Sequence, residues 1–368
     1  FRSLEDLRKL PIITRTDLKR GFPDEVTAGS LLTTRGLPNA TSGTTGTPLP
    51  FYNDLGPDSG SHVLASRLLL NRMAGIRPME RCVYFSRTID TAMMRFRELQ
   101  LSALEVSRRS IMKLVSMIKR YKPVCIGGFA STLSSMVALM QEMRQPLDLR
   151  LKAAISTGET VLSSQRKRIE ESFGCEVFDR YGSRELSGYL AQECGFHSGL
   201  HVNSEFVLLE IVDGDEPVAA GERGRIIAMD LHNFVMPFIR YDTQDIGVAG
   251  EDCACGRSMP VLRDIQGRST DLLETESGDF IPLHMVANAT AAKYASAFQQ
   301  IQFIQRRPGY AILLAVPSVK MEERILDEAS EYLGGLFAGI SFELQLVEEI
   351  PPEKSGKRPL LRKRFESR

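Results

Sequence analysis

The sequence lacks an excess of charge of either sign. Its 368 residues hold 46 lysines and arginines against 46 aspartates and glutamates, so no overall field points to nucleic acid or to an anionic membrane. No apolar run approaches the roughly 18 residues that a membrane span needs, and no secretory signal is visible. Internal repeats and low-complexity tracts are absent as well. We therefore predict a chain with neither a nucleic-acid nor a membrane partner.

Cysteine is scarce, with six in the whole chain, too few for a disulfide scaffold at this length. A reducing, cytoplasmic setting is therefore predicted. Half of the cysteines lie within or beside apolar runs and are interpreted as small buried side chains, namely Cys82, Cys125 and Cys175. The others lie near glycine and charged residues, which is a different context, and they are Cys194, Cys253 and Cys255.

What the chain does have is an alternation of short apolar strands and helices. The patterns predict strands at 83–85, 124–128, 151–155 and 176–181, and helices at 102–121, 131–143 and 163–173. Such alternation is typical of a parallel sheet with helices on its faces. After residue 181, strand-like segments joined by Gly, Pro and Asp turns predict a β-rich subdomain.

A second change of pattern follows residues 267–271. The rest of the chain predicts a small α+β domain, with helices at 284–298 and 320–334 and strands at 301–306, 310–316 and 341–347. The length also favours two domains. We therefore predict an α/β protein: a large N-terminal domain, 1–270, with a parallel sheet flanked by helices plus the β-rich subdomain, and a small mobile C-terminal α+β domain, 271–368.

Residues 41–48, Thr-Ser-Gly-Thr-Thr-Gly-Thr-Pro, form a turn of small residues. Its glycines allow backbone N–H groups to face one concavity, and its hydroxyls add donors for phosphate oxygens. It is not a Walker A loop, because no lysine follows Gly46, and it lacks the three-glycine spacing of a dinucleotide fingerprint. On composition alone, a flexible linker is an equally good interpretation.

Three further stretches, 156–160, 181–185 and 241–245, end predicted strands. Ligands of open α/β sheets bind at such strand ends. Tyr181 can stack on a purine, the carboxylate of Glu185 can hold Mg²⁺, and Asp245 can accept hydrogen bonds from ribose hydroxyls. Taken singly, each stretch is equally a strand end with a polar cap.

In order and spacing, however, the stretches resemble the core motifs of the acyl-adenylate-forming superfamily, and within it the phenylacetate–coenzyme A ligase family. The resemblance rests on residues 41–48, 181–185, 236–245, 253–257, 267–271 and 355–357. It implies that the chain uses ATP to activate a carboxylic acid as an acyl-adenylate, with release of pyrophosphate, and then transfers the acyl group.

The resemblance also implies an ATP site. Its residues would share one nucleotide: Thr41, Ser42, Gly43, Thr44, Thr45 and Gly46 around the β- and γ-phosphates, Gly158 and Glu159 beside the adenine, Tyr181 stacked on it with Gly182 next in the chain, Asp245 on the ribose, and Arg268 near ribose or phosphate. Arg184, which follows in the same stretch as Tyr181, is a further candidate for the site.

Two residues are implied as catalytic, Glu185 as the Mg²⁺ ligand and Lys357 as the lysine brought to the substrate carboxylate and the α-phosphate. Attack of a carboxylate on the α-phosphorus brings two anions together, so a positioned ammonium and Mg²⁺ lower the barrier. Asp271 would be the hinge of the small domain. Without the resemblance, residues 354–364 would be interpreted as a solvated basic tail.

The chain departs from the family pattern at four positions. The family has Lys at the position of Thr47 and Thr or Ser at the position of Arg184. It has Gly at the position of Gln244 and Asp at the position of Thr270. Arg184 can contact phosphate through its fork or can fill the site. These departures motivate an alternative, a nucleotide-binding homologue with impaired catalysis.

The resemblance favours coenzyme A as the acyl acceptor and an aryl or arylacetic acid as the substrate. An amine or a carrier-protein thiol as acceptor would use the same first step, and both stay open. The sequence leaves a homodimer open as well.

The second cysteine group predicts a metal site. A tetrahedral Cys₃His zinc site in the β-rich part, about 194–260, would be formed by Cys194, Cys253, Cys255 and His201. His197 is the alternative to His201 as the fourth ligand. Two alternatives stay open, three reduced cysteines on surface loops and a zinc-dependent interaction module.

Overall fold

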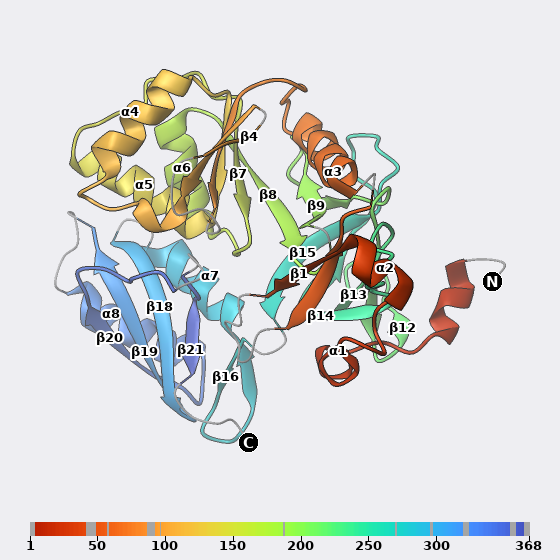
Figure 1. The fold of residues 1–368 in the computed structure, drawn as a ribbon. Coiled ribbons are helices and arrows are strands. Elements are labelled where there is room, and N and C mark those ends of the chain that lie inside the picture. The colour runs from red at the N-terminus through yellow and green to blue at the C-terminus, as the bar shows by residue number, and fades with distance from the viewer. Residues whose placement is uncertain are drawn as a thin grey trace. The chain divides into compact units, whose positions relative to one another are not determined.

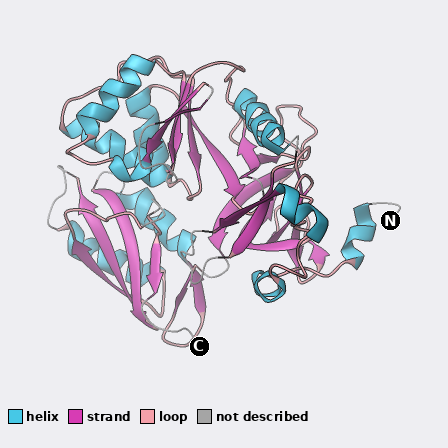
Figure 2. Cartoon of the chain, in the orientation of Figure 1, coloured by secondary structure: helices cyan, strands magenta, loops and turns pink. Residues whose placement is uncertain are grey.

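The computed structural model describes residues 4–41, 49–56, 59–86, 93–95, 97–186, 188–268, 271–294, 297–318, 324–353 and 358–363. The chain forms two compact units, each made of two segments. Unit 1 combines residues 1–78 and 178–269, and unit 2 combines residues 79–177 and 270–368. Both units contain helices and strands (Figures 1 and 2), which confirms the predicted α/β class.

Unit 1 is built on antiparallel strands. In spatial order they are β12 (Glu216–Pro217), β11 (Val207–Asp213), β13 (Arg223–Asp230), β14 (Tyr241–Ala249), β15 (Val261–Arg268), β10 (Leu200–Val202), β9 (Gly188–Glu193) and β8 (Glu176–Ser183). Each neighbouring pair in this series is antiparallel. This is the β-rich part that the turn-separated segments predict.

The rest of unit 1 lies before residue 78. It contains a separate hairpin and four helical segments: β1 (Gly36–Ala40), β2 (Pro50–Asp54), η1 (Leu4–Lys9), α1 (Arg15–Gly21), α2 (Gly29–Arg35) and α3 (Ser59–Met73). Helix α1 begins with a capping box, in which Thr14 and Asp17 satisfy each other's backbone N–H groups. The core of the unit packs Leu18 and Phe51 with strand residues such as Ala228 and Leu262.

Unit 2 contains the parallel sheet that the alternation predicts. Its strands in spatial order are β7 (Ala153–Thr157), β6 (Cys125–Gly128), β3 (Cys82–Ser86) and β5 (Glu98–Ser102), all parallel, with β4 (Met93–Arg95) antiparallel to β5. Helices α4 (Ile111–Tyr121), α5 (Ala130–Glu142) and α6 (Ser163–Phe173) share a core with these strands (Figure 1).

The predicted helix 102–121 is wrong in its first half. Residues 98–102 pair with β3 as strand β5, a 3-10 turn follows at Ala103–Glu105, and α4 begins only at Ile111. The helical spacing holds from there, because Ile111, Leu114, Val115 and Ile118 form one buried stripe. Of residues 102–110 only Ser102 belongs to a strand, while Ala103 and Val106 are buried in the same core without being part of an α-helix, which periodicity alone does not reveal.

The second segment of unit 2 is a small α+β arrangement. It contains the hairpin β16 (Leu272–Glu274) and β17 (Phe280–Pro282), helices α7 (Leu283–Tyr294) and α8 (Ile325–Leu336), and a sheet in the order β20 (Ser341–Leu346), β19 (Tyr310–Pro317), β18 (Phe298–Arg307), β21 (Leu361–Lys363). These elements match the α+β pattern expected for 271–368. A separate, mobile domain that begins at residue 271 stays a prediction, because residues 270–368 form one compact unit together with residues 79–177.

No helix among the described residues is both long and apolar enough to cross a membrane.

Candidate nucleotide site and metal cluster

Three of the predicted nucleotide residues contact one another in unit 1. The hydroxyl of Tyr181, near the end of β8, donates to Oδ2 of Asp245 in β14 over 2.5 Å. Nε of Arg268, the last residue of β15, lies 3.9 Å from the other oxygen, Oδ1. Burial and then the Asp245 charge raise the pKa of Tyr181 well above its ordinary value. The antiparallel strands therefore gather an aromatic ring, a carboxylate and a guanidinium.

A second contact lies beside this one. The Tyr241 hydroxyl, at the start of β14, is 3.4 Å from Oε1 of Glu185, and burial followed by the Glu185 charge raises the pKa of Tyr241. The sequence points to Glu185 and to Asp245 but not to Tyr241. The only signal for this tyrosine is its place at the first position of the 241–245 stretch.

A tight turn sets the position of Asp245. Gln244 has φ of +65°, the left-handed region that favours glycine. Its N–H donates to Oδ1 of Asp242 and the next N–H, that of Asp245, donates to the hydroxyl of Thr243. The departure from glycine at this position therefore falls on strained backbone, which for a residue other than glycine costs about 1–2 kcal/mol.

Gly182 follows Tyr181 in β8 and meets a close backbone neighbour. A Cβ built on Gly182 would lie 2.5 Å from the carbonyl oxygen of Gly188 in β9. Only glycine fits this register, so Gly182 fixes how closely β8 and β9 approach behind the tyrosine.

The ends of the predicted phosphate loop are held together. Thr41 N donates to the carbonyl of Leu49, and the Thr41 hydroxyl accepts from Leu49 N at 2.9 Å and from a guanidinium nitrogen of Arg15 at 3.1 Å. The remaining loop residues, Ser42, Gly43, Thr44, Thr45, Gly46, Thr47 and Pro48, lie outside the described residues. Their phosphate role stays a prediction.

Arg184 contacts the hairpin of β1 and β2 near the start of this loop. Its side chain is exposed and donates to Oδ1 of Asn39 in β1 at 3.2 Å. This contact tethers the guanidinium on the surface of unit 1, beside the strand that leads into residues 41–48.

Gly158 and Glu159 belong to unit 2. Gly158 has φ of +75° directly after β7, so the chain turns sharply there. The Glu159 carboxylate accepts two backbone N–H groups, that of Ser131 at 2.9 Å and that of Arg358 at 2.8 Å. The predicted place of Glu159 beside an adenine stays untested. Lys357 lies outside the described residues.

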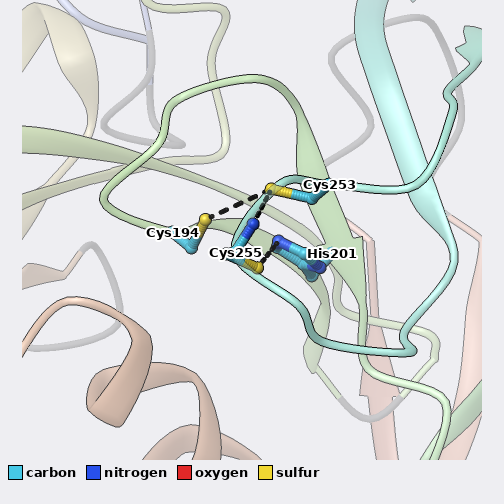
Figure 3. Close-up of side chains that lie close together, drawn as sticks. All are labelled: Cys194, His201, Cys253 and Cys255. Carbon is cyan, nitrogen blue, oxygen red and sulfur yellow. Dashed lines mark hydrogen bonds between the residues drawn. The ribbon is translucent and has the colours of Figure 1, made fainter.

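The four predicted zinc ligands come together in unit 1 (Figure 3). Cys194 follows β9, His201 is in β10, and Cys253 and Cys255 lie between β14 and β15. The ligand atoms all lie within 4.8 Å of one another. Sγ of Cys194 is 3.8 Å from Sγ of Cys253, and Sγ of Cys255 is 3.4 Å from Nε2 of His201. A tetrahedron with Zn–S bonds of about 2.3 Å has edges of about 3.8 Å, so the spacing fits zinc.

The protonation preferences of the cluster differ from ligand to ligand. Burial raises the pKa of the Cys194 thiol to about 11. Burial acts in the same direction on Cys255, but hydrogen bonds from Arg257 and the other thiols outweigh it and lower its pKa to about 7. Burial and the Arg257 charge lower the pKa of His201, which favours the neutral imidazole that a metal needs.

His197, the substitute ligand, is engaged elsewhere. Its Nδ1 lies 3.1 Å from Oε2 of Glu193, and its ring packs against Phe178 at 5.1 Å between centroids. Of the two histidines, the structure brings His201 to the thiols.

Comparison with known proteins gives relatives of one kind. No family model matches the chain. It is 29% identical over 329 residues to a phenylacetate–coenzyme A ligase of Thermus thermophilus, covering 84% of this chain and 71% of the relative. It is 27% identical over 321 residues to the Escherichia coli enzyme of the same name, covering 83% and 71%.

Two solved structures share the fold. A 2-hydroxyisobutyryl-CoA ligase in complex with an acyl-AMP superposes with a TM-score of 0.81 at 21% identity, covering 98% of this chain and 81% of the other. An anthranilate CoA ligase in complex with anthranoyl-AMP gives 0.64 at 18% identity, covering 87% and 65%. This chain therefore has the fold of the adenylate-forming ligases and is a homologue of the phenylacetate–coenzyme A ligases.

Proposed function

We propose that the chain is an ATP-dependent ligase that converts a carboxylic acid to an acyl-adenylate and then transfers the acyl group to coenzyme A. The observation that carries the proposal is the contact of Tyr181 and Arg268 with one carboxylate, that of Asp245, in a chain whose relatives bear the name of this activity. An aromatic face, a ribose acceptor and a cation are the groups that adenosine phosphate binding needs.

In the first half-reaction, an oxygen of the substrate carboxylate attacks the α-phosphorus of ATP, and the bond from that phosphorus to the bridging oxygen breaks to release pyrophosphate. Mg²⁺ on Glu185 would neutralise phosphate charge. Asp245 would orient the nucleotide through its ribose hydroxyls, and Lys357 would stabilise the charge that builds on the phosphoryl oxygens. In the second, a thiol attacks the acyl carbon and AMP leaves.

The names of the two sequence relatives favour an aryl or arylacetic acid as the substrate. The decisive experiment is a screen of carboxylic acids by pyrophosphate release, with and without coenzyme A. We expect release that requires an acid, and a thioester only when coenzyme A is present. If product forms with an amine or a carrier protein but not with coenzyme A, that compound and not coenzyme A is the acyl acceptor. ATP binding without turnover on any acid would instead support a homologue with impaired catalysis.

We also propose a structural zinc ion on Cys194, His201, Cys253 and Cys255. The spacing of the ligand atoms and the lowered pKa of the imidazole support it. Such an ion would join the β9–β10 connection to the loop before β15 and so stabilise unit 1.

Three further expectations from the sequence, on the cellular setting, the C-terminal domain and the oligomeric state, accompany this proposal. None of the six cysteines forms a disulfide, which fits the proposed reducing, cytoplasmic setting. Residues 271–368 would act as a mobile lid turning near Asp271. A homodimer stays open.

A further inference from the structure

Glu159 stands between two parts of unit 2 that are remote in sequence. Its Oε2 accepts the N–H of Ser131 at 2.9 Å and its Oε1 accepts the N–H of Arg358 at 2.8 Å, so each carboxylate oxygen has a backbone donor. The two donors are 28 and 199 residues away along the chain. Hydrogen bonds to a charged acceptor are about twice as strong as neutral ones.

The first donor is at a helix end. Ser131 is the second residue of α5, whose N-cap residue, Phe129, provides no side-chain cap. The first N–H groups of a helix have no partner within it, and a negative charge is favourable at this end. Glu159 therefore caps α5 from another part of the chain, and α5 in turn fixes the carboxylate.

The second donor is the peptide N–H that directly follows Lys357. Nε of Arg358 also donates to the carbonyl of Ile350 at 2.8 Å, so both ends of the stretch 350–358 are tied to each other. Beyond it, Gln302 donates to the carbonyl of Pro359 and Phe303 N donates to that of Leu360, which anchors the following residues on β18. The backbone of Arg358, the residue that follows Lys357 in the sequence, is therefore held between the sheet and Glu159.

Other contacts join the same segments without the carboxylate. Arg168 of α6 donates to the carbonyls of Phe298 and Gln299 at 3.1 Å each, and Gln300 donates to the hydroxyl of Ser135 at 2.9 Å. Loss of Glu159 should therefore leave these segments packed and release only the backbone next to Lys357.

We propose that Glu159 is a positioning residue for Lys357. By clamping the peptide N–H after the lysine to the N-terminus of α5, it sets the lysine for the adenylation step. This inference rests on the proposed function and deepens it, because it assigns Glu159 to the lysine and not to the nucleotide base.

The kinetic test compares Glu159→Ala and Glu159→Gln with the wild type in each half-reaction. We expect Glu159→Ala to lower kcat for pyrophosphate release about 10- to 100-fold, and Glu159→Gln to lower it less, because its amide oxygen still accepts one bond. Thioester formation from supplied acyl-adenylate should change less than about twofold, since the lysine serves only the first step. Glu170→Gln is the matched control, because Glu170 also accepts a backbone N–H group, that of Val177.

Two kinetic outcomes would overturn the proposal. A higher KM for ATP with unchanged kcat would place Glu159 at the adenine. If Glu159→Ala lowers kcat for pyrophosphate release further in a chain that already carries Lys357→Ala, the carboxylate acts without the lysine. Positioning through the lysine instead predicts that the double variant has the same kcat as Lys357→Ala.

A second readout is independent of catalysis. Trypsin cleaves after Lys354 and Lys357, and its rate follows the opening of the local backbone. We expect cleavage there to be about tenfold faster in Glu159→Ala than in the wild type or in Glu170→Gln. Unchanged cleavage would refute the clamp whatever the enzyme does. Faster cleavage in a protein that activates no acid would keep the clamp and refute the proposed function.

Discussion

Asp245 is the residue on which the proposed nucleotide site depends, because its two carboxylate oxygens face the Tyr181 hydroxyl and the Arg268 guanidinium. A hydrogen bond from a hydroxyl to a charged acceptor contributes a net free energy of about 1.5–3 kcal/mol. Asp245→Asn puts an amide in its place and disturbs both contacts. We expect KM for ATP to rise about 10- to 100-fold, measured by pyrophosphate release.

The exposed Asp213, at the end of β11 in the same unit, provides the matched control. Asp213→Asn should leave KM for ATP unchanged. If Asp245→Asn also leaves it unchanged, Asp245 does not bind the nucleotide.

Gly182 allows a test of the backbone behind Tyr181. Since a Cβ there would lie 2.5 Å from the Gly188 carbonyl, Gly182→Ala must push β8 and β9 apart. Overpacking of this kind typically costs about 1–3 kcal/mol, so we expect a lower Tm in thermal denaturation together with weaker ATP binding. Gly29→Ala is the comparison, since a Cβ at Gly29 meets nothing within 4 Å; an equal effect of the two substitutions would contradict the steric argument.

At the scale of elements, the metal cluster joins the β9–β10 connection, strand β10 and the loop before β15 through side chains rather than backbone. We expect purified protein to contain about one zinc ion per chain. Cys253→Ser should remove the metal and lower Tm, measured by metal analysis and thermal denaturation, because a structural zinc contributes directly to folding.

Cys175 belongs to unit 2 and is not one of the four residues of the cluster, so Cys175→Ser should keep the full zinc content. Protein without zinc, or a Cys253→Ser variant with unchanged Tm, would rule out the structural ion. Loss of a binding partner on Cys253→Ser with normal adenylation would instead favour an interaction module.

At the scale of the whole molecule, the proposed mechanism assigns one lysine to one half-reaction. Lys357→Ala removes the ammonium that offsets the meeting of two anions, so pyrophosphate release should fall at least about 100-fold. Thioester formation from supplied acyl-adenylate should stay within about twofold, because no such charge builds in that step. Quantification of pyrophosphate and of thioester separates the two.

Lys119, on helix α4 beside Asp148, is a suitable comparison for loss of a positive charge. Lys119→Ala should change neither half-reaction. Equal loss of both half-reactions in Lys357→Ala would contradict the assignment of the lysine to adenylation.

The sequence by itself determined the features that short stretches of chain encode. Strand and helix periodicity predicts the parallel sheet and the α+β C-terminal segment, and residue type predicts which four side chains suit zinc. The order of the motifs predicts the relationship to the phenylacetate–coenzyme A ligases, since it needs no knowledge of the fold.

Only the tertiary structure decided which of these residues meet. Tyr181 and Asp245 are 64 residues apart, and Glu159 and Arg358 are 199 apart. No local pattern predicts such contacts, because they depend on how strands pair and where a chain segment returns. The same holds for the start of the predicted helix 102–121, because Ser102 pairs with β3 as the last residue of β5 and the helix begins only at Ile111. Strand pairing buries a segment against distant partners, and that burial outweighs local preference.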